Sequence, residues 1–282
     1  MNNVDALQHA ADLIAQADAL VIAAGAGMGV DSGLPDFRGD HGLWRQFPLA
    51  NGQNLDIMEL ASPQTFDTDP ELAWGFYGNR LAMYRQTRPH AGFEILKRWT
   101  KNKRFGAWVF TSNVDGQFQK AGFDAAQVEE CHGSLHELQC IAPCTESVWH
   151  ADALDPVIDP VSFRHRSPLP RCPHCGSLAR PNVLMFSDYH FVYERTEGHR
   201  KRRHLWLTPI ADAQARLLVI ELGAGTTVVS VRHFSHLMAR DYAARLIRIN
   251  PKEADVDQPT DIGIAMPAAA ALMQIDSLLM GK

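Results

Sequence analysis

A glycine-rich stretch at residues 25–39 combines a phosphate-binding pattern with an acid, an aromatic ring and a cation. It follows Ala19–Ala24, a short apolar run typical of a buried parallel strand. Glycines at the end of such a strand let backbone amides approach a pyrophosphate closely. The side chains of Asp36, Phe37 and Arg38 suit a ribose–nicotinamide group, whereas a structural turn needs none of them. The glycines alone would equally suit a tight strand-to-helix turn.

Two cysteine pairs further along the chain are spaced as two knuckles that grip one metal ion. The pairs are Cys140 with Cys144 and Cys172 with Cys175. The second pair is the stronger signal, because Pro173 and Gly176 favour a tight turn that points both sulfurs inward. Four thiolates close a tetrahedral shell, so we expect a structural zinc ion that activates no water. Unrelated buried thiols are the alternative. Cys131 lies outside both pairs and is expected in the core.

Polar residues follow a second predicted strand, Phe105–Thr111. Asn113 and Asp115 have the chemistry to hold a carboxamide and a ribose, although either could instead cap the next helix. His132 lies where the predicted sheet meets the cysteine-bearing segment, at the border of the expected cleft. Imidazole is the side chain best matched to proton transfer near neutral pH, so His132 is a candidate general base, with a structural histidine as the alternative.

The elements that must position these groups alternate between helix and strand. Strands are predicted over Ala19–Ala24, Phe105–Thr111, Asn182–Phe186, Arg216–Leu222 and Leu246–Asn250. Helices are predicted over Val4–Ala17, Pro70–Gln86, His90–Thr100, Arg232–Ala244 and Pro267–Met280. This alternation indicates an α/β fold, a Rossmann-like parallel sheet with helices on both faces.

Two segments break the alternation. Residues 41–88 form a helical insertion and residues 132–180 contain both cysteine pairs, so we expect them to form a smaller, discontinuous zinc-binding and helical domain. Residues 1–40, 89–131 and 181–282 would form the Rossmann-like domain that binds the nucleotide. The cleft between the two domains would lie near the carboxyl ends of the strands, where ligands bind in such folds.

Composition indicates an ordinary soluble protein, with a formal net charge of −5 and 21% charged residues among 282. We expect no nucleic-acid partner, and no membrane span because no apolar run approaches the ~20 residues required. The N-terminal residues carry Asp5 and Asp12 without a basic region, unlike a signal peptide, so we expect a cytoplasmic location. The basic cluster Arg200–Arg203 is expected in a solvated helix start or loop, with an anionic partner site as the alternative.

Together these motifs resemble the sirtuin family, and the match runs in order over nearly the whole chain. The matching residues are Gly25-Ala26-Gly27, Pro35-Asp36-Phe37-Arg38-Gly39, Asn113-Val114-Asp115, His132-Gly133, both cysteine pairs, and Gly225-Thr226-Thr227 followed by Asn250. The resemblance implies NAD-dependent removal of acyl groups from the lysines of a protein or peptide. The products would be nicotinamide and O-acyl-ADP-ribose, so NAD would be a consumed co-substrate.

The resemblance also implies roles for individual residues. After nicotinamide leaves, His132 would act as general base so that a ribose hydroxyl attacks the imidate, while Asn113 and Asp115 orient that ribose. The implied NAD-binding residues are Gly25, Ala26 and Gly27 at the pyrophosphate, Asp36, Phe37, Arg38 and Ser112 around the nicotinamide ribose, and Gly225, Thr226 and Asn250 at the adenosine end. The peptide would enter as an added strand near Phe186–Asp188 and Val228–Ser230.

The helical insertion bears on the acyl group. Tyr77 and Arg80, with Ala61 sixteen residues before the tyrosine, resemble the pattern of the desuccinylase and demalonylase class of sirtuins. Arg80 would make a charge-assisted hydrogen bond to an acyl carboxylate, and Tyr77 would add a hydroxyl donor. The alternative is an amphipathic helix with Tyr77 in its core and Arg80 on its surface.

One residue and two short segments depart from the family pattern. Ser112 replaces the usual glutamine, Phe186-Ser187-Asp188 replaces Phe-Gly-Glu, and Val229-Ser230-Val231 replaces Val-x-Pro. Peptide binding is therefore less firmly implied than NAD binding. A sirtuin-like ADP-ribosyltransferase or NAD hydrolase is the alternative function. A non-catalytic NAD-binding module is a third hypothesis, and the presence of His132 argues against it.

Overall fold

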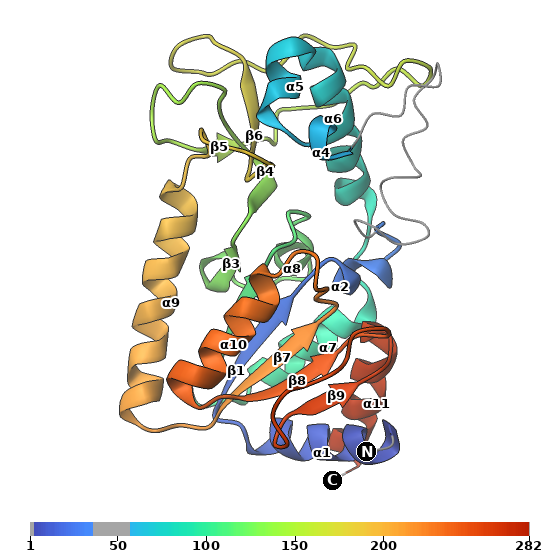
Figure 1. Ribbon diagram of the computed structural model, residues 1–282, viewed down its shortest axis with the longest axis vertical. Helices are drawn as coiled ribbons and strands as arrows, with labels where there is room; N and C mark the ends of the chain where they lie inside the picture. The colour runs from blue at the N-terminus through green and yellow to red at the C-terminus, as the bar shows by residue number, and fades with distance from the viewer. Residues whose placement is uncertain (1–2, 36–56, 282) are drawn as a thin grey trace.

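The computed structural model describes residues 3–35 and 57–281, with a parallel sheet in the lower half of Figure 1 and a smaller antiparallel sheet in the upper half. The parallel sheet has six strands in the order β3-β2-β1-β7-β8-β9. Their bounds are β1 Ala19–Ala24, β2 Ala107–Thr111, β3 Val128–Glu130, β7 Leu217–Leu222, β8 Arg245–Ile249 and β9 Ile262–Ile264. The predicted fold class is confirmed.

Strand β1 shows why helices cover both faces of this sheet. All six of its residues are buried, and successive side chains of a strand point to opposite faces. Leu20 and Ile22 therefore join one core, with helices α1 Asn3–Gln16, α7 Ala91–Thr100 and α11 Ala268–Met280. Val21 and Ala23 join the other core, with helices α9 Glu194–Asp212 and α10 Ser230–Tyr242. Short helices α2 Gly27–Val30 and α8 Gln117–Lys120 come after β1 and β2, and the 3-10 turn Ala125–Gln127 directly precedes β3.

The smaller part of the molecule joins a three-stranded sheet to a helical segment. Its strands are β4 Gly133–Cys140, β5 Trp149–His150 and β6 Ala179–Val183, in the order β5-β4-β6. Its helices are α4 Ile57–Leu60, α5 Pro63–Thr68 and α6 Pro70–Gln86. They share one hydrophobic core that includes Trp74 and Leu138.

One predicted strand of the parallel sheet is wrong. Asn182–Phe186 was expected there, but the strand spans Ala179–Val183 and pairs antiparallel with β4 in the small sheet. A short apolar run indicates a strand without indicating its partner, because the pairing is set by contacts far along the chain. The small sheet therefore closes around residues immediately before and after the cysteine-rich segment.

Helix α9, which the sequence pattern did not predict, runs from the small sheet down along the edge of the large one (Figure 1). Its buried residues are few for a 19-residue helix: Thr196, His199, Leu207 and Ile210. Ion pairs attach the helix to the sheet instead. Arg195 pairs with the buried Glu130, and Arg203 pairs with the buried Glu129 of edge strand β3.

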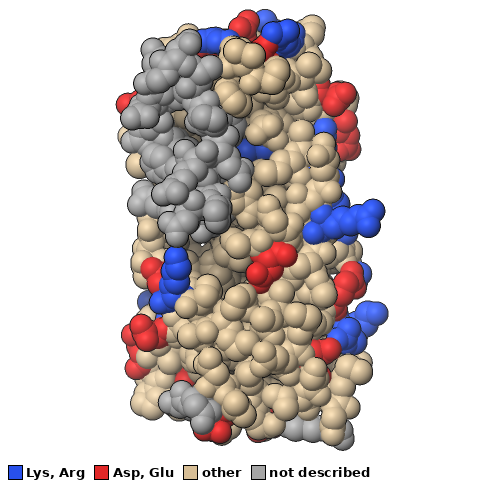
Figure 2. All heavy atoms as spheres, turned by 90° about the vertical axis from the view of Figure 1, so that its right-hand side faces the viewer, with Lys and Arg blue, Asp and Glu red and all other residues tan. Residues whose placement is uncertain are grey.

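The basic cluster Arg200–Arg203 lies inside α9, so its placement at a helix start or in a loop was wrong. Arg203 points toward the sheet, and Arg202 donates to the backbone oxygen of Ala126. Arg200 forms an exposed ion pair with Glu197. Most of the cluster's cationic charge is thus engaged within the protein. On the face drawn in Figure 2, most basic and acidic side chains of the described residues lie near the rim, and an acidic group lies near the middle.

Within the described residues, no helix is both long and apolar enough to cross a bilayer.

The loops that leave β1 and β7 touch through their backbones. The amide of Gly25 donates to Leu222 O at 2.9 Å, and that of Gly27 donates to Gly223 O at 3.0 Å. A Cβ atom on Gly25 would lie 2.7 Å from Gly223 O, and one on Gly223 would lie 2.4 Å from the carbonyl carbon of Gly27. Gly223 also has φ +58°, in the left-handed region. No side chain fits between the two loops.

We expect Gly223→Ala to destabilise the chain by about 2 kcal/mol or more, because the methyl group meets backbone and the residue must keep positive φ. Urea unfolding followed by circular dichroism measures the loss. Gly225→Ala is the matched control, since the nearest atom to its added Cβ is Glu253 Oε2 at 3.6 Å. Equal stability losses in the two variants would contradict the role assigned to Gly223.

Candidate functional site

The carboxyl ends of four neighbouring strands bring most of the predicted site residues to one edge of the parallel sheet. Strands β2, β1, β7 and β8 are adjacent and parallel, so the segments that follow them lie side by side. These segments carry Ser112, Asn113 and Asp115 after β2, Gly25, Ala26 and Gly27 after β1, Gly225 and Thr226 after β7, and Asn250 after β8. The predicted Asp36, Phe37 and Arg38 lie outside the described residues.

In the loop after β1, the amides of Gly25 and Gly27 are committed to carbonyl oxygens of the β7 end. Ala26 between them is exposed, and the described residues give its amide no hydrogen-bond acceptor. It stands immediately before helix α2, where a backbone amide suits an anion. The glycines therefore shape this loop, and Ala26 offers the donor.

Asn113 and Asp115 are held in different ways. The side-chain nitrogen of Asn113 donates to Gly25 O at 2.9 Å, which ties the β2 loop to the glycine loop. Asp115 is buried and accepts the amide of Gln117, the first residue of helix α8, at 2.9 Å, although Gly116 is the N-cap residue of that helix. Burial raises the pKa of Asp115 to about 6. Ser112 donates its amide to Ala24 O, which keeps the start of this loop in register with β1.

His132 lies between strand β3 of the large sheet and strand β4 of the small one, at the junction that the sequence predicted. Its Nε2 atom is 3.0 Å from Ser230 Oγ at the start of α10. Burial lowers its pKa, so the imidazole is neutral near pH 7 and has a lone pair with which to take a proton. The next residue, Gly133, has φ +80°, and a Cβ there would lie 1.9 Å from Asn182 O. Glycine is therefore required for β6 to pass beside the histidine.

At the β7 and β8 ends, a carboxylate that sequence reasoning missed organises the loops. Glu253 accepts both the amide and the hydroxyl of Thr226, each at 2.9 Å. Asn250 donates to Ala224 O at 3.1 Å and accepts the amide of Glu253. An acidic residue shortly after a strand that leads to the cleft was the available signal.

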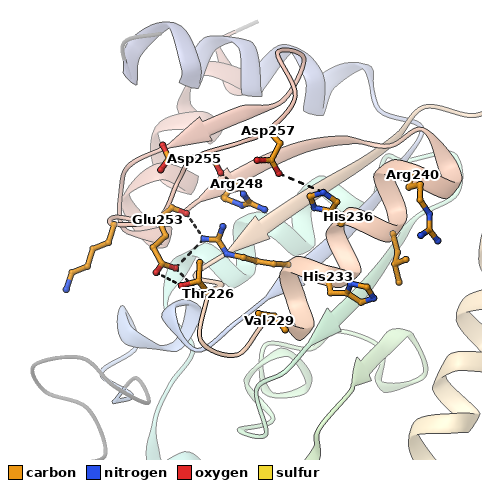
Figure 3. A pocket seen from close by; sticks show the side chains of 12 residues that line it. Thr226, Val229, His233, His236, Arg240, Arg248, Glu253, Asp255 and Asp257 are labelled. Carbon is orange, nitrogen blue, oxygen red and sulfur yellow. Dashed lines mark hydrogen bonds and ion pairs between the residues drawn. The ribbon is translucent and has the colours of Figure 1, made fainter.

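A pocket of about 600 Å³ opens beside these residues, between helix α10 and the segment after β8 (Figure 3). Thr226 and Glu253 form its border with the predicted adenosine end. At its exposed side, His236 points toward Asp257, 3.8 Å away (Figure 3). The guanidinium of Arg248 is paired with the buried Glu221 of strand β7, outside the pocket lining. Several charged groups of this pocket thus already have partners within the protein.

The residues predicted to select the acyl group are brought together in the core of the small domain. Ala61, Tyr77 and Arg80 are all buried, so the alternative with Arg80 on the helix surface is wrong. Burial raises the pKa of Tyr77, which keeps its hydroxyl protonated. Phe186 donates its amide to Ala61 O at 3.2 Å and packs against the same core.

Arg80 is satisfied by aromatic groups. Its Nε and Nη2 atoms donate to the hydroxyl of Tyr84 at 3.2 and 2.8 Å, and its guanidinium lies 5.2 Å from the ring centre of Phe76. Within residues 3–35 and 57–281, no carboxylate forms an ion pair with it. Asp115 interacts with it electrostatically from beyond ion-pair distance. A buried cation without a direct counter-ion suits an anionic ligand.

The segment after β6 is anchored by a buried ion pair. Arg180 and Asp188 meet at 2.8 Å with fully buried side chains, and Asp188 also accepts the amide of His190. Ser187, at the position where the family pattern has glycine, has φ +54°. The altered Phe186-Ser187-Asp188 segment therefore keeps a defined, strained turn.

The four paired cysteines form one cluster in the small domain. Their sulfurs all lie within 4.8 Å of one another, with Cys140–Cys175 and Cys144–Cys172 distances of 3.6 Å. Tetrahedral zinc with Zn–S bonds of about 2.3 Å requires sulfurs about 3.8 Å apart. The predicted cluster for a structural zinc ion is thus confirmed. Cys131 packs against the core of the large sheet, and burial raises its thiol pKa to about 12.

Comparison with known proteins gives concordant results. The Sir2 family model matches residues 25–200. An NAD-dependent protein deacylase of Thermococcus kodakarensis is 27% identical over 269 residues, spanning 95% of this chain and 94% of that protein. NAD-dependent protein deacylase 1 of Pseudomonas aeruginosa is 30% identical over 268 residues, spanning 94% and 95%. A solved Sir2 homolog–NAD complex is 25% identical, with a TM-score of 0.70 over 97% of this chain and 94% of that one.

The cysteine cluster predicts a metal content. The wild-type chain purified without chelator should carry about one zinc per molecule. Cys172→Ser should lose the zinc and unfold at a lower temperature, because three cysteines do not complete the zinc coordination that stabilises the small sheet. Elemental analysis by mass spectrometry and thermal unfolding measure the two effects. Cys131→Ser is the control that should retain zinc. Retention of zinc by Cys172→Ser would exclude the four-cysteine site.

Proposed function

This chain belongs to the Sir2 family, and on that premise we propose which of its residues carry out the reaction. It is an NAD-dependent protein deacylase, acting on acyl-lysine side chains. We assign His132 as the general base of the reaction because of its surroundings. A neutral, partly buried imidazole stands between the two sheets, bonded to the helix that follows the β7 loop.

The strand-end segments hold the NAD co-substrate in this proposal. Ala26 donates to the pyrophosphate from the loop shaped by Gly25 and Gly27. Asn113 and Asp115 orient the nicotinamide ribose, and Ser112 with Asp36, Phe37 and Arg38 border it. Thr226, Gly225 and Asn250 receive the adenosine end, with Glu253 holding Thr226 in place. Asp115 is buried, and a carboxyl group there can accept hydrogen bonds from hydroxyl groups.

The reaction proceeds in two stages. The acyl oxygen of lysine first attacks the nicotinamide ribose, and nicotinamide leaves with the electrons of the broken bond. His132 then removes a proton from a ribose hydroxyl, whose oxygen attacks the imidate carbon. Water completes the release of lysine and acylated ADP-ribose. His132 is thus needed in the second stage, and its lowered pKa suits acceptance of that proton.

For the acyl group, we propose an acidic one such as succinyl or malonyl. The buried cation of Arg80, without an ion pair among the described residues, supports this choice. Tyr77 adds a protonated hydroxyl nearby, and Ala61 leaves space for the longer chain. The substrate protein would lie along Phe186, whose loop is fixed by the Arg180–Asp188 pair. Cysteines grouped as a metal site, and not joined in disulfides, support a reducing, cytoplasmic location.

An alternative activity is ADP-ribosyl transfer or NAD hydrolysis. Ser112 is too short to reach as far as the glutamine that the family usually carries, so the nicotinamide end is held less tightly. That activity would release nicotinamide without an acyl-lysine peptide. The anchored loop at Phe186 favours deacylation, since it preserves a surface for the peptide.

In the deciding experiment, the zinc-loaded enzyme is incubated with NAD and an acetylated, malonylated or succinylated peptide. Loss of acyl mass should appear together with nicotinamide and acylated ADP-ribose, measured by mass spectrometry. His132→Ala should lower acyl removal by at least about 100-fold, because the base is lost, and should keep its zinc. Nicotinamide release that is independent of every peptide would favour the alternative. Absence of any NAD turnover would support the third hypothesis, a non-catalytic NAD-binding module.

Substitution of Arg80 tests the acidic acyl group. Arg80→Met should lower kcat/KM for a succinylated peptide about 10- to 100-fold, as expected for a lost charge-assisted hydrogen bond. The value for an acetylated peptide should change less than about 3-fold, because acetyl makes no such bond. Arg80→Lys, which keeps the charge, should retain part of the succinyl activity. Equal losses on both peptides would make Arg80 structural.

A further inference from the structure

Ser230 makes a contact that the reaction described above does not use. Its hydroxyl oxygen is 3.0 Å from Nε2 of His132, although 98 residues separate the two in the chain. Ser230 is the first residue of helix α10 and is partly buried. It lies in the Val229-Ser230-Val231 segment, where this chain departs from the family pattern.

The start of α10 is held rigidly, so the contact does not depend on a loose loop. Val231 is buried against the sheet, and the ring of Phe234 stacks on Phe110 of β2 with centroids 3.8 Å apart. Arg232 donates to the backbone oxygen of Ala224, which ties the helix to the β7 loop. Ser230 is therefore fixed on the same support as the nucleotide-binding edge.

The bonding of His132 assigns a direction to this hydrogen bond. The ring also hydrogen-bonds the backbone of Ser112, and that bond favours the protonated ring, so the imidazole is its donor. A neutral imidazole has one N–H and one lone pair. With the proton on the nitrogen that faces Ser112, Nε2 accepts from the hydroxyl of Ser230. The lone pair that the general base needs is thus already directed at Ser230.

We propose that Ser230 relays the ribose proton to His132. The ribose O–H bond breaks and its proton passes to Ser230 Oγ, while the proton of Ser230 passes to Nε2 of His132. The freed electron pair on the ribose oxygen forms the bond to the imidate carbon, and the imidazolium keeps the proton. Ser230 ends the step as a hydroxyl again. The inference rests on the proposed function and concerns only its second stage.

The test separates the two stages. Exchange of labelled nicotinamide into NAD, in the presence of an acyl-peptide, reports the first stage, and formation of acylated ADP-ribose reports the second. Ser230→Ala should lower kcat for acylated ADP-ribose about 10-fold or more, with nicotinamide exchange and KM for NAD within about 3-fold of wild type. Ser230→Thr keeps a hydroxyl and should restore most of the rate.

Ser277→Ala is the matched control, because that hydroxyl bonds Met273 O on α11, far along the chain from the site, and its loss should change neither stage. Full kcat in Ser230→Ala would overturn the relay. A loss in Ser230→Ala that Ser230→Thr does not restore would also overturn it and leave a packing role. Absence of nicotinamide exchange in the wild-type enzyme with every acyl-peptide would instead reject the proposed function itself.

Discussion

The direct backbone contact between the loops after β1 and β7 is the constraint on which the site depends. The amides of Gly25 and Gly27 donate hydrogen bonds to carbonyl oxygens at the β7 end. Gly223 packs so closely against this loop that no side chain fits between the two. The contact joins the ends of two strands whose following segments carry residues predicted to bind the nucleotide. It also places the exposed amide of Ala26 at the start of α2. The glycine pattern is thus a packing requirement first, and anion binding follows from it.

The buried arginines differ in whether a carboxylate pairs with them directly. Three arginines are buried among the described residues: Arg80, Arg180 and Arg248. Arg180 is neutralised by Asp188 and fixes the segment at Phe186, and Arg248 is neutralised by Glu221 within the parallel sheet. The direct side-chain contacts of Arg80 are aromatic rings and the hydroxyl of Tyr84, and Asp115 acts on it electrostatically without an ion pair. Arg180 and Arg248 thus have direct carboxylate partners, whereas Arg80 has none among the described residues.

Sequence patterns predicted the elements whose signals are local. The strand Ala19–Ala24 and the helix Pro70–Gln86 were predicted with their observed bounds, because apolar runs and proline at a helix start act within a few residues. The cysteine cluster was predicted because each pair is short-range and metal geometry joins them. Helix α9 was missed, since it docks through arginine–glutamate pairs and lacks an apolar stripe. The partner of β6 and the roles of Glu253 and Ser230 depend on contacts between distant segments, which one sequence does not reveal.

The position of His132 depends on both sheets. The residue ends a segment of the parallel sheet and begins one of the antiparallel sheet, so both sheets determine where its ring lies. Its own carbonyl accepts the amide of Leu184, just beyond β6, while its ring reaches α10 on the far side. Gly133 allows β6 to pass at that point. A shift of the small sheet would therefore move His132, the proposed base, relative to the strand ends. The part of the chain that carries the cysteine cluster is coupled in this way to the candidate site.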